Sequence, residues 1–197
     1  AAKWADRSDK PLIPCLIRLG VNNEGKLRKL LSSIRKDHIV EAKMCADEWK
    51  EIEYKTVPSV AMARYTKAFG KHDARRFAAF KEKVKKGEVK VHAEALFPHD
   101  CIRTAKNGDA DMADLQFEAL PNYMEGNERI MVLCDTSGSM QSPIAGSIHA
   151  IDVSMSLALY CSDRLGKDNP FYRKFLGFES ETHFKDWTGM SFSEAIG

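Results

Sequence analysis

The sequence predicts an α/β fold class, in which a mostly helical N-terminal region precedes the first part of a doubly wound, Rossmann-like domain. Two observations support this prediction. Apolar residues recur at helical spacing through the first half of the 197-residue chain. After residue 129 the pattern changes to a continuous apolar segment, a long apolar helix and a second apolar segment. That order indicates a parallel strand–helix–strand unit.

The helical region contains five segments whose apolar residues would form one face of a helix. Asp73 is expected to cap the fourth segment, and Gly87 is expected to end it. Pro98 is expected to open the fifth. The five segments are Glu24–Lys36, Ile39–Ile52, Pro58–Phe69, Asp73–Lys86 and Pro98–Asn107.

Residues 107–128 are acidic and rich in turn-forming residues. This composition predicts a linker with a short helix around Leu115–Ala119. We therefore expect three parts along the chain: a basic helical region over residues 1–106, an acidic linker over residues 107–128, and the N-terminal part of an α/β domain over residues 129–197.

In the α/β part, Ile130–Cys134 is a continuous apolar run, as expected of a strand buried on both faces. Ser142 and Pro143 are typical first residues of a helix, which should run to about Asp163. Phe171–Phe178 has the pattern of a second strand. Because so small a sheet leaves open edges and uncovered apolar faces, we expect further residues or another chain to complete it.

Charge is distributed unevenly along the chain. Residues 1–107 carry 24 basic and 14 acidic side chains, a net charge of +10, whereas residues 108–197 carry 6 and 14, a net charge of −8. Two interpretations remain open. Either the two halves have different partners, or they attract each other and otherwise form solvated faces.

A run of lysines near the end of the fourth predicted helix is a candidate nucleic-acid surface, since clustered lysines can contact phosphates. The alternative is that they form the solvated face of an amphipathic helix. These candidate residues are Lys81, Lys83, Lys85, Lys86 and Lys90.

A second candidate site follows the first predicted strand. Asp135 is followed at the second and fourth positions by Ser137 and Ser139, and Gly138 is expected to let the backbone bend. A carboxylate and two hydroxyls suit a hard divalent cation, Mg²⁺ above all, or Ca²⁺ or Mn²⁺. The position agrees, because open α/β sheets bind ligands beyond the carboxyl ends of their strands.

This Asp-x-Ser-x-Ser motif after an apolar strand resembles the metal-ion-dependent adhesion site (MIDAS) of von Willebrand factor A domains. The resemblance implies an A-like fold in which Asp135 holds the metal mainly through water while Ser137 and Ser139 bind it directly. It also implies a Thr and an Asp from later loops. The remaining coordination position would take water or a carboxylate from a protein partner.

The later Thr of that family lies in a segment similar to Gly189–Ile196. Ser191 takes the Thr position here, and Thr188 is the second candidate. Ser191 and Glu194 also form a capping-box pattern, so an ordinary helix start is the alternative interpretation of Ser191. The sequence through residue 197 offers no candidate for the final Asp.

The first half carries another resemblance, over most of residues 25–103. It is similar to a family of unknown function in plants and large viruses, whose members join a basic helical region to an A-like domain. More distantly, the arrangement is similar to the Ro autoantigen (TROVE) proteins, which implies RNA binding by the helical region. The segments that carry the similarity are Glu53–Met62, Lys71–Asp73, Lys83–Gly87 and Ala95–His99.

These observations favour a non-enzymatic binding protein that engages an acidic protein partner through the metal. RNA binding is the alternative, and a viral structural or assembly role is a weaker one. No set of residues has readable spacing for catalysis. Five cysteines without a Cys-x-x-Cys pair favour reduced thiols and a cytoplasmic location. Without an apolar run of 18 residues, we expect no membrane partner.

Overall fold

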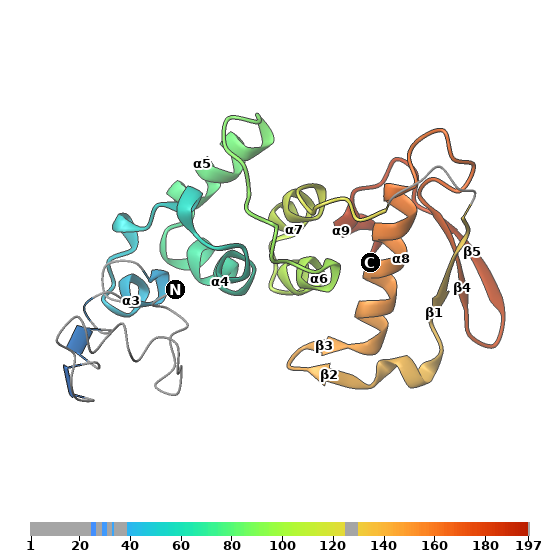
Figure 1. Ribbon diagram of the computed structural model, residues 1–197, viewed down its shortest axis with the longest axis horizontal. Coiled ribbons are helices and arrows are strands. Elements are labelled where there is room, and N and C mark those ends of the chain that lie inside the picture. The colour runs from blue at the N-terminus through green and yellow to red at the C-terminus, as the bar shows by residue number, and fades with distance from the viewer. Residues whose placement is uncertain (1–24, 27–28, 31–32, 34–38, 125–129, 197) are drawn as a thin grey trace. The chain divides into compact units, whose positions relative to one another are not determined.

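The computed structural model in Figure 1 describes residues 25–26, 29–30, 33, 39–124 and 130–196. The chain divides into two compact units, Ala1–Glu53 and Tyr54–Gly197. The predicted helix Glu24–Lys36 lies mostly outside the described residues, and its five described residues are helical.

In the first unit, the predicted helix Ile39–Ile52 is broken into two shorter elements. These are α3 (Val40–Cys45) and a 3-10 turn, η1 (Trp49–Glu51). Between them Asp47 has a φ of 59°, in the left-handed region, and its carboxylate accepts a 2.6 Å hydrogen bond from the Trp49 indole. A residue in this conformation cannot continue an α-helix, so the local turn overrides the apolar periodicity.

The second unit begins with helices close to those predicted. Three of the predicted helices, observed as α4, α5 and α6, are confirmed with small changes in their bounds. Helices α4 and α5 pack together around aromatic side chains. The elements are η2 (Tyr54–Thr56), α4 (Ser59–His72), α5 (Ala74–Lys85), α6 (Pro98–Lys106) and α7 (Ala110–Glu118).

The Tyr54 ring is the centre of this aromatic cluster. The ring centroids of Phe69, Phe77 and Phe80 lie 5.2–5.6 Å from that of Tyr54. The Tyr54 hydroxyl donates a 2.8 Å hydrogen bond to Asp73. The pKa of Tyr54 is raised, mainly by burial of the side chain and secondly by this hydrogen bond. Asp73 therefore joins η2 to the start of α5 and makes no side-chain capping bond, contrary to the prediction.

The predicted linker, residues 107–128, contains the helix α7 over nine of its residues, where the sequence predicted a shorter helix around Leu115–Ala119. Asp109 caps α7 by accepting a 3.1 Å hydrogen bond from the Met112 amide. Met112, Ala113 and Phe117 are buried, and one apolar core joins α6 and α7 to the sheet and α8. The predicted divisions at residues 106 and 129 both fall inside the compact unit Tyr54–Gly197.

The sheet contains a parallel pair, as predicted, and an additional antiparallel strand. β1 (Val132–Asp135) pairs in parallel with β4 (Lys174–Phe178), and the helix α8 (Ala150–Arg164) lies between them in sequence. β5 (Thr182–Asp186) pairs antiparallel with β4, which gives the order β1-β4-β5. The fold class is therefore mixed α and β with a small mixed sheet.

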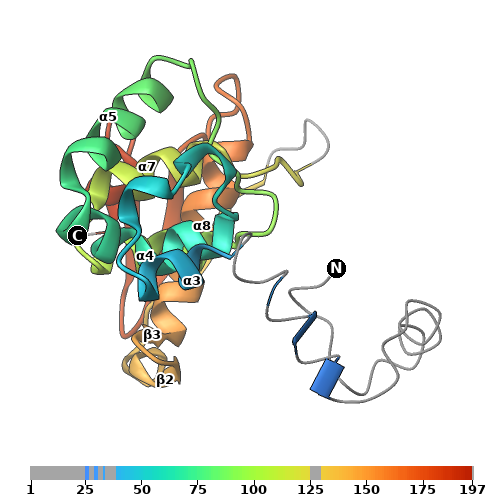
Figure 2. The same cartoon turned by 90° about the vertical axis from the view of Figure 1, so that its left-hand side faces the viewer.

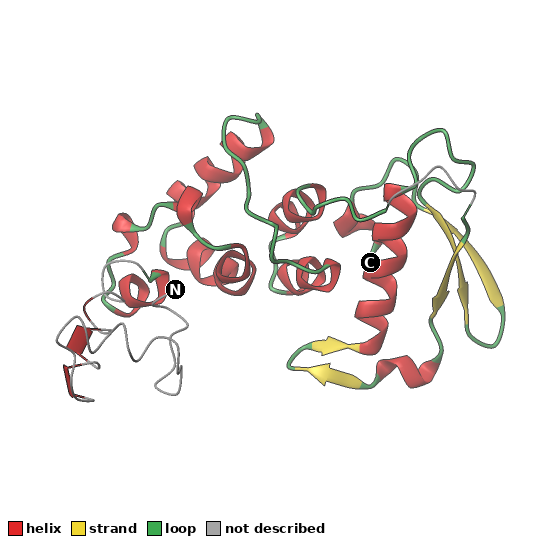
Figure 3. Ribbon diagram, viewed as in Figure 1, coloured by secondary structure: helices red, strands yellow, loops and turns green. Residues whose placement is uncertain are grey.

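The predicted helix start at Ser142–Pro143 is wrong. After a 3-10 turn, η3 (Gly138–Gln141), the chain forms a separate hairpin of β2 (Pro143–Ala145) and β3 (Ile148–His149), seen in Figure 3. α8 begins at Ala150, where the Asp152 carboxylate accepts a 2.9 Å hydrogen bond from the His149 amide. Figures 1 and 2 show the hairpin at the N-terminal end of α8.

Helix α8 packs against the helices on one side and the sheet on the other (Figure 1). At its first turn, Asp152 forms a 2.6 Å ion pair with Lys106 of α6. At its last turn, the Arg164 guanidinium donates to the carbonyls of Phe117 (3.0 Å) and Leu120 (3.3 Å), at the end of α7. These contacts hold the helices and the sheet in one unit.

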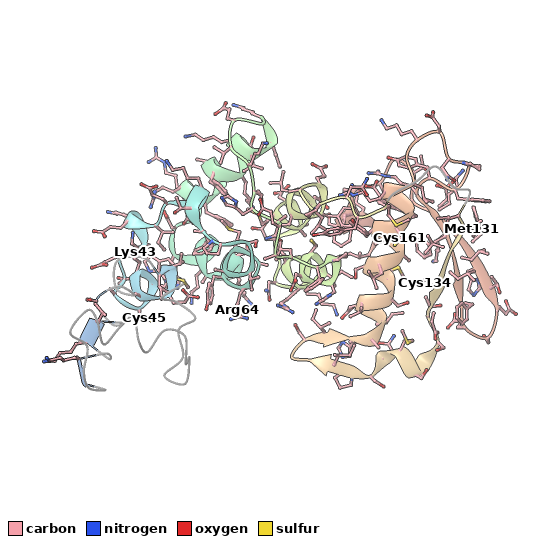
Figure 4. The ribbon with its side chains drawn as sticks, in the orientation of Figure 1. Lys43, Cys45, Arg64, Met131, Cys134 and Cys161 are labelled. Carbon is pink, nitrogen blue, oxygen red and sulfur yellow. The ribbon has the colours of Figure 1, made fainter. Side chains whose placement is uncertain are left out.

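The two faces of the sheet differ in their exposure. Cys134 and Phe175 are buried, and the Cys134 thiol lies 3.3 Å from the Ser154 hydroxyl on α8 (Figure 4). Leu133, Leu176 and Phe184 are neighbours in the pairing register. Leu133 is 66% exposed and Phe184 56% exposed. The sheet is therefore apolar on both faces, while α8 covers one of them.

No helix within the described ranges is both long enough and apolar enough to cross a membrane.

We predict that Arg164→Ala lowers the free energy of unfolding by about 2–4 kcal/mol, because it leaves the carbonyls at the end of α7 without their donor and removes one of the two guanidinium partners of Asp163, the other being Arg173. Chemical denaturation measures this. Arg75→Ala, which removes an exposed guanidinium from α5, is the control and should change stability by less than about 0.5 kcal/mol. Equal effects of the two substitutions would contradict the proposed role of Arg164.

Candidate metal centre

The Asp135-x-Ser137-x-Ser139 segment, called here the metal loop, starts at the last residue of β1. The Ser137 amide donates a 2.9 Å hydrogen bond to the Asp135 carboxylate. The hydroxyl oxygens of Ser137 and Ser139 lie 3.1 Å apart. The structure therefore brings together the three oxygen-bearing side chains that the motif predicted.

Pairing with β4 fixes the position of this loop. Thr136 donates two hydrogen bonds to the Phe178 carbonyl, from its amide (2.9 Å) and its hydroxyl (3.0 Å). Gly177 lies beneath Thr136, where a Cβ atom would be 3.6 Å from the Thr136 side chain. The loop is thus attached to the carboxyl end of the neighbouring parallel strand, where ligands of α/β sheets bind.

Gly138 is not needed for the bend in the way that the sequence suggested. Its φ is not in the left-handed region, and a Cβ atom there would meet nothing within 4 Å. The turn is instead closed by hydrogen bonds from the Met140 amide to the Ser137 carbonyl and from the Ser142 hydroxyl to the Ser139 carbonyl, at 2.9 and 2.8 Å.

The Asp135 carboxylate has the charge state that a cation requires. Hydrogen bonds from the Ser137 side chain and then its backbone amide lower the pKa of Asp135 from its ordinary value. Asp135 and Ser137 are half-buried and Ser139 is exposed, so solvent and ligands can reach the loop. The site is therefore an ionised carboxylate beside two accessible hydroxyls.

Ser191 and Thr188 are not brought to the metal loop. They follow β5, whose last residue, Asp186, pairs with Lys174 at the start of β4, whereas the metal loop adjoins Phe178 at its end. Four residue steps along a strand span about 13 Å. The two groups therefore lie at opposite ends of the sheet, and Figure 1 shows α9 (Phe192–Ala195) far from the hairpin that follows the loop.

Ser191 takes the alternative role that its sequence pattern allowed, which is to cap a helix. Its hydroxyl accepts a hydrogen bond from the Glu194 amide at 3.3 Å, and its own amide donates to the Glu194 carboxylate at 2.7 Å. Ser193, in the first turn of α9, donates through its amide and hydroxyl to Asp114 of α7, at 2.7 and 2.9 Å. These hydroxyls therefore hold α9 in place.

Asp186 offers an internal comparison for the metal loop. Like Asp135 it ends a strand, and it accepts a 2.9 Å hydrogen bond from the amide two residues later, that of Thr188. The backbone and then the side chain of Thr188 lower the pKa of Asp186. The fourth residue after it is Met190, so this turn lacks the second hydroxyl of the metal loop.

The donors of the metal loop fit a hard, hydrated cation. In the described part of the chain, no group of three or more His, Cys, Asp or Glu residues is placed to hold a metal ion. The metal loop instead combines one carboxylate with two hydroxyls. Mg²⁺ prefers oxygen ligands and usually keeps several waters when it binds protein, so this sparse set suits it.

The candidate nucleic-acid lysines divide into two groups. Lys81 lies 2.8 Å from Asp109, and Lys85 lies 2.9 Å from Asp111. For these two, the attraction between the basic and acidic halves is the interpretation that agrees with the structure. Three others are exposed, and no ion pair is recorded for them among the described residues: Lys83, Lys86 and Lys90.

Comparison with known proteins identifies relatives without an established activity. The chain is 21% identical over 221 aligned positions to "Uncharacterized protein L728" of Acanthamoeba polyphaga mimivirus. That alignment covers 99% of this chain and 37% of the viral protein, so the chain spans well under half of this relative's length. No solved structure matches.

A family match covers residues 23–132, which include α3 to α7 and end at the first residue of β1, before the metal loop. The matched segment is more than half of the 197 residues. It agrees with the similarity of the helical region to a family of unknown function. The chain therefore belongs to the family described as "Domain of unknown function (DUF2828)".

Proposed function

We propose that this chain is a non-enzymatic binding protein with a von Willebrand factor A-like fold, in which a divalent cation on the metal loop engages an acidic group of a protein partner. The observation that carries the proposal is the convergence of Asp135, Ser137 and Ser139 at the carboxyl end of a strand that pairs in parallel with its neighbour. Mg²⁺ is the proposed cation.

Two features of the sheet support the A-like fold. The parallel pair β1–β4 joined through α8 is the starting unit of a doubly wound sheet, and such sheets often carry an antiparallel edge strand such as β5. The row of exposed Leu133, half-buried Leu176 and exposed Phe184 is also consistent, because a doubly wound sheet is covered by helices on both faces.

Charge supports the choice of an acidic partner. A divalent cation held by Asp135 through water, with no other carboxylate in the loop, retains a net positive charge, since the serine hydroxyls are neutral. The cation would then attract a further carboxylate into a position otherwise held by water. In this proposal the loop residues bind and orient the ion, and the Asp135 carboxylate serves the cation.

Ser191 and Thr188 are not part of the proposed site, because they lie at the opposite end of the sheet. The proposal therefore rests on three protein ligands, with water or other groups completing the coordination.

RNA binding by the basic helical region is a second candidate function. It is favoured by the exposure of Lys83, Lys86 and Lys90, which face solvent and form no ion pair with the acidic side chains of the described ranges.

We predict that Asp135→Asn weakens Mn²⁺ binding by about 10- to 100-fold, the loss typical when a group that orients a metal site through an outer-shell contact is removed. Mn²⁺ is used in place of Mg²⁺ because its binding can be followed by electron paramagnetic resonance. The matched control is Asp186→Asn, which changes an equivalent strand-end carboxylate that lacks the second hydroxyl.

The control should bind Mn²⁺ as the native chain does. The proposal fails if the native chain binds no Mn²⁺ at millimolar concentration, or if the two substitutions have the same effect. Loss of partner binding on metal chelation, and its retention in Asp186→Asn, would extend the test to recognition.

We also predict that, as pH is lowered, Mn²⁺ affinity is lost with a midpoint below the ordinary aspartate pKa of about 3.9. The pKa of Asp135 is lowered in the folded state, so the ionised form is present above that range and is lost only as pH falls through the lower folded pKa. Ser137→Ala should raise the Asp135 pKa. Carboxyl-carbon NMR titration measures both, and an Asp135 pKa at or above the ordinary value would contradict the prediction.

A further inference from the structure

The basic side chains around α4 to α6 fall into two groups with different surroundings. Those of the first group each lie 2.6–3.1 Å from an aspartate oxygen, so their charge is already balanced within the fold. The first group consists of Arg76, Lys81, Lys85, Arg103 and Lys106.

The second group includes three residues of α4, called here the basic stripe: Arg64, Lys67 and Lys71. All three are exposed, and no ion pair or hydrogen bond of their side chains is recorded among the described residues. Their spacing of three and then four residues puts them on one helical face, with neighbouring Cβ atoms about 5–6 Å apart.

The sequence of α4 makes this face unusual for an ordinary solvated helix. The helix has 14 residues and no acidic side chain. Exposed helix faces commonly intersperse opposite charges, because Glu–Lys pairs at such spacings stabilise the helix, whereas like charges repel. Lys71 lies in the last turn and offsets the helix dipole there, but Arg64 and Lys67 lie in the middle of the helix, where the dipole does not favour a cation.

The stripe is held on a rigid support. Met62, Thr66 and Phe69 on the other faces of α4 are buried, so the helix cannot rotate about its axis. Figure 4 shows Arg64 projecting from α4 on the side away from α5. A ligand would therefore meet three cations whose backbone positions are fixed in advance.

We propose that the basic stripe binds the phosphodiester backbone of a nucleic-acid strand. Lysine and arginine side chains at this spacing can pair with successive phosphates and release the condensed counterions. The proposal rests on the second candidate function, and it moves the principal contact from the lysine run at residues 81–90 to α4.

Exposed apolar side chains distinguish this ligand from an anionic membrane surface. Amphipathic helices that bind membranes insert large apolar residues beside their basic ones. The described residues of α4 and α5 include no exposed large hydrophobic side chain. The stripe therefore has the charge for phosphates and lacks the apolar residues for lipid insertion.

The test compares two triple substitutions that each remove three positive charges. Arg64→Gln/Lys67→Gln/Lys71→Gln removes the stripe, and Lys83→Gln/Lys86→Gln/Lys90→Gln is the matched control on the exposed lysines of the run. Fluorescence anisotropy measures the binding of short labelled single strands of RNA and of DNA, of the same sequence, over a range of salt concentrations. Thermal unfolding checks that both variants keep the native midpoint.

The stripe variant should bind the strands at least about tenfold more weakly than the native chain. The slope of log affinity against log salt concentration should become shallower by about 2, as expected for the loss of three phosphate contacts to a single strand. The control should lose less in both measures. Tighter binding of RNA than of DNA supports RNA as the source of the backbone. Equal binding supports the stripe and counts against an RNA-specific function.

Two results would overturn the inference. If the control loses as much affinity as the stripe variant, or more, the stripe is not the principal surface, although nucleic-acid binding stands. If the native chain binds neither strand at low salt, or binds only vesicles of anionic lipid, the RNA-binding function fails as well.

Discussion

The packing of α8 between the helices and the sheet is the constraint on which the rest of the second unit depends. Leu159 and Ala158 are buried, and the helix contacts α6 on one side and β1 and β4 on the other. Lys106 holds its first turn through Asp152, and the end of α7 holds its last turn through Arg164. Because α8 also connects β1 to β4, its position determines the parallel register that places the metal loop.

Elements whose residues make mainly local contacts could be predicted from the sequence. The apolar periodicity of α4 to α6 and α8 and the apolar run of β1 indicated these elements. The predicted burial of β1 on both faces is wrong, because Leu133 is 66% exposed while Cys134 is buried. Only the second half of helix α7 was predicted, as a short helix around Leu115–Ala119, because the acidic residues before it indicated a turn. Their charge is balanced instead by Lys81 and Lys85, which are distant in sequence.

Two further differences between the predicted and the observed elements are also caused by contacts that the local sequence does not show. Ser142 and Pro143 carry a valid local signal for a helix start, but Pro143 pairs with His149. The helix begins seven residues later than predicted, where Asp152 accepts the hydrogen bond from the His149 amide. Strand β5 has no buried residue to mark it, since all five of its positions are exposed. Pairing with β4 alone makes it a strand, and a single sequence does not reveal that pairing.

The candidate metal site shows what a motif can and cannot specify. Asp135, Ser137 and Ser139 are close in sequence, so the strand and the turn after it bring them together. Ser191 matched a second motif by composition, but whether it reaches the loop depends on the direction of β5. The antiparallel register of that strand carries the chain to the opposite end of the sheet. Local ligand sets are therefore predictable here, and distant ones are not.

The most direct test of the metal site is a crystal of the chain grown with Mn²⁺ and measured at the manganese absorption edge. We expect an anomalous peak about 2–2.5 Å from the hydroxyl oxygens of Ser137 and Ser139, with Asp135 reached directly or through one water. A crystal at saturating Mn²⁺ with no peak at this loop, or with a peak at Asp186 instead, would contradict it.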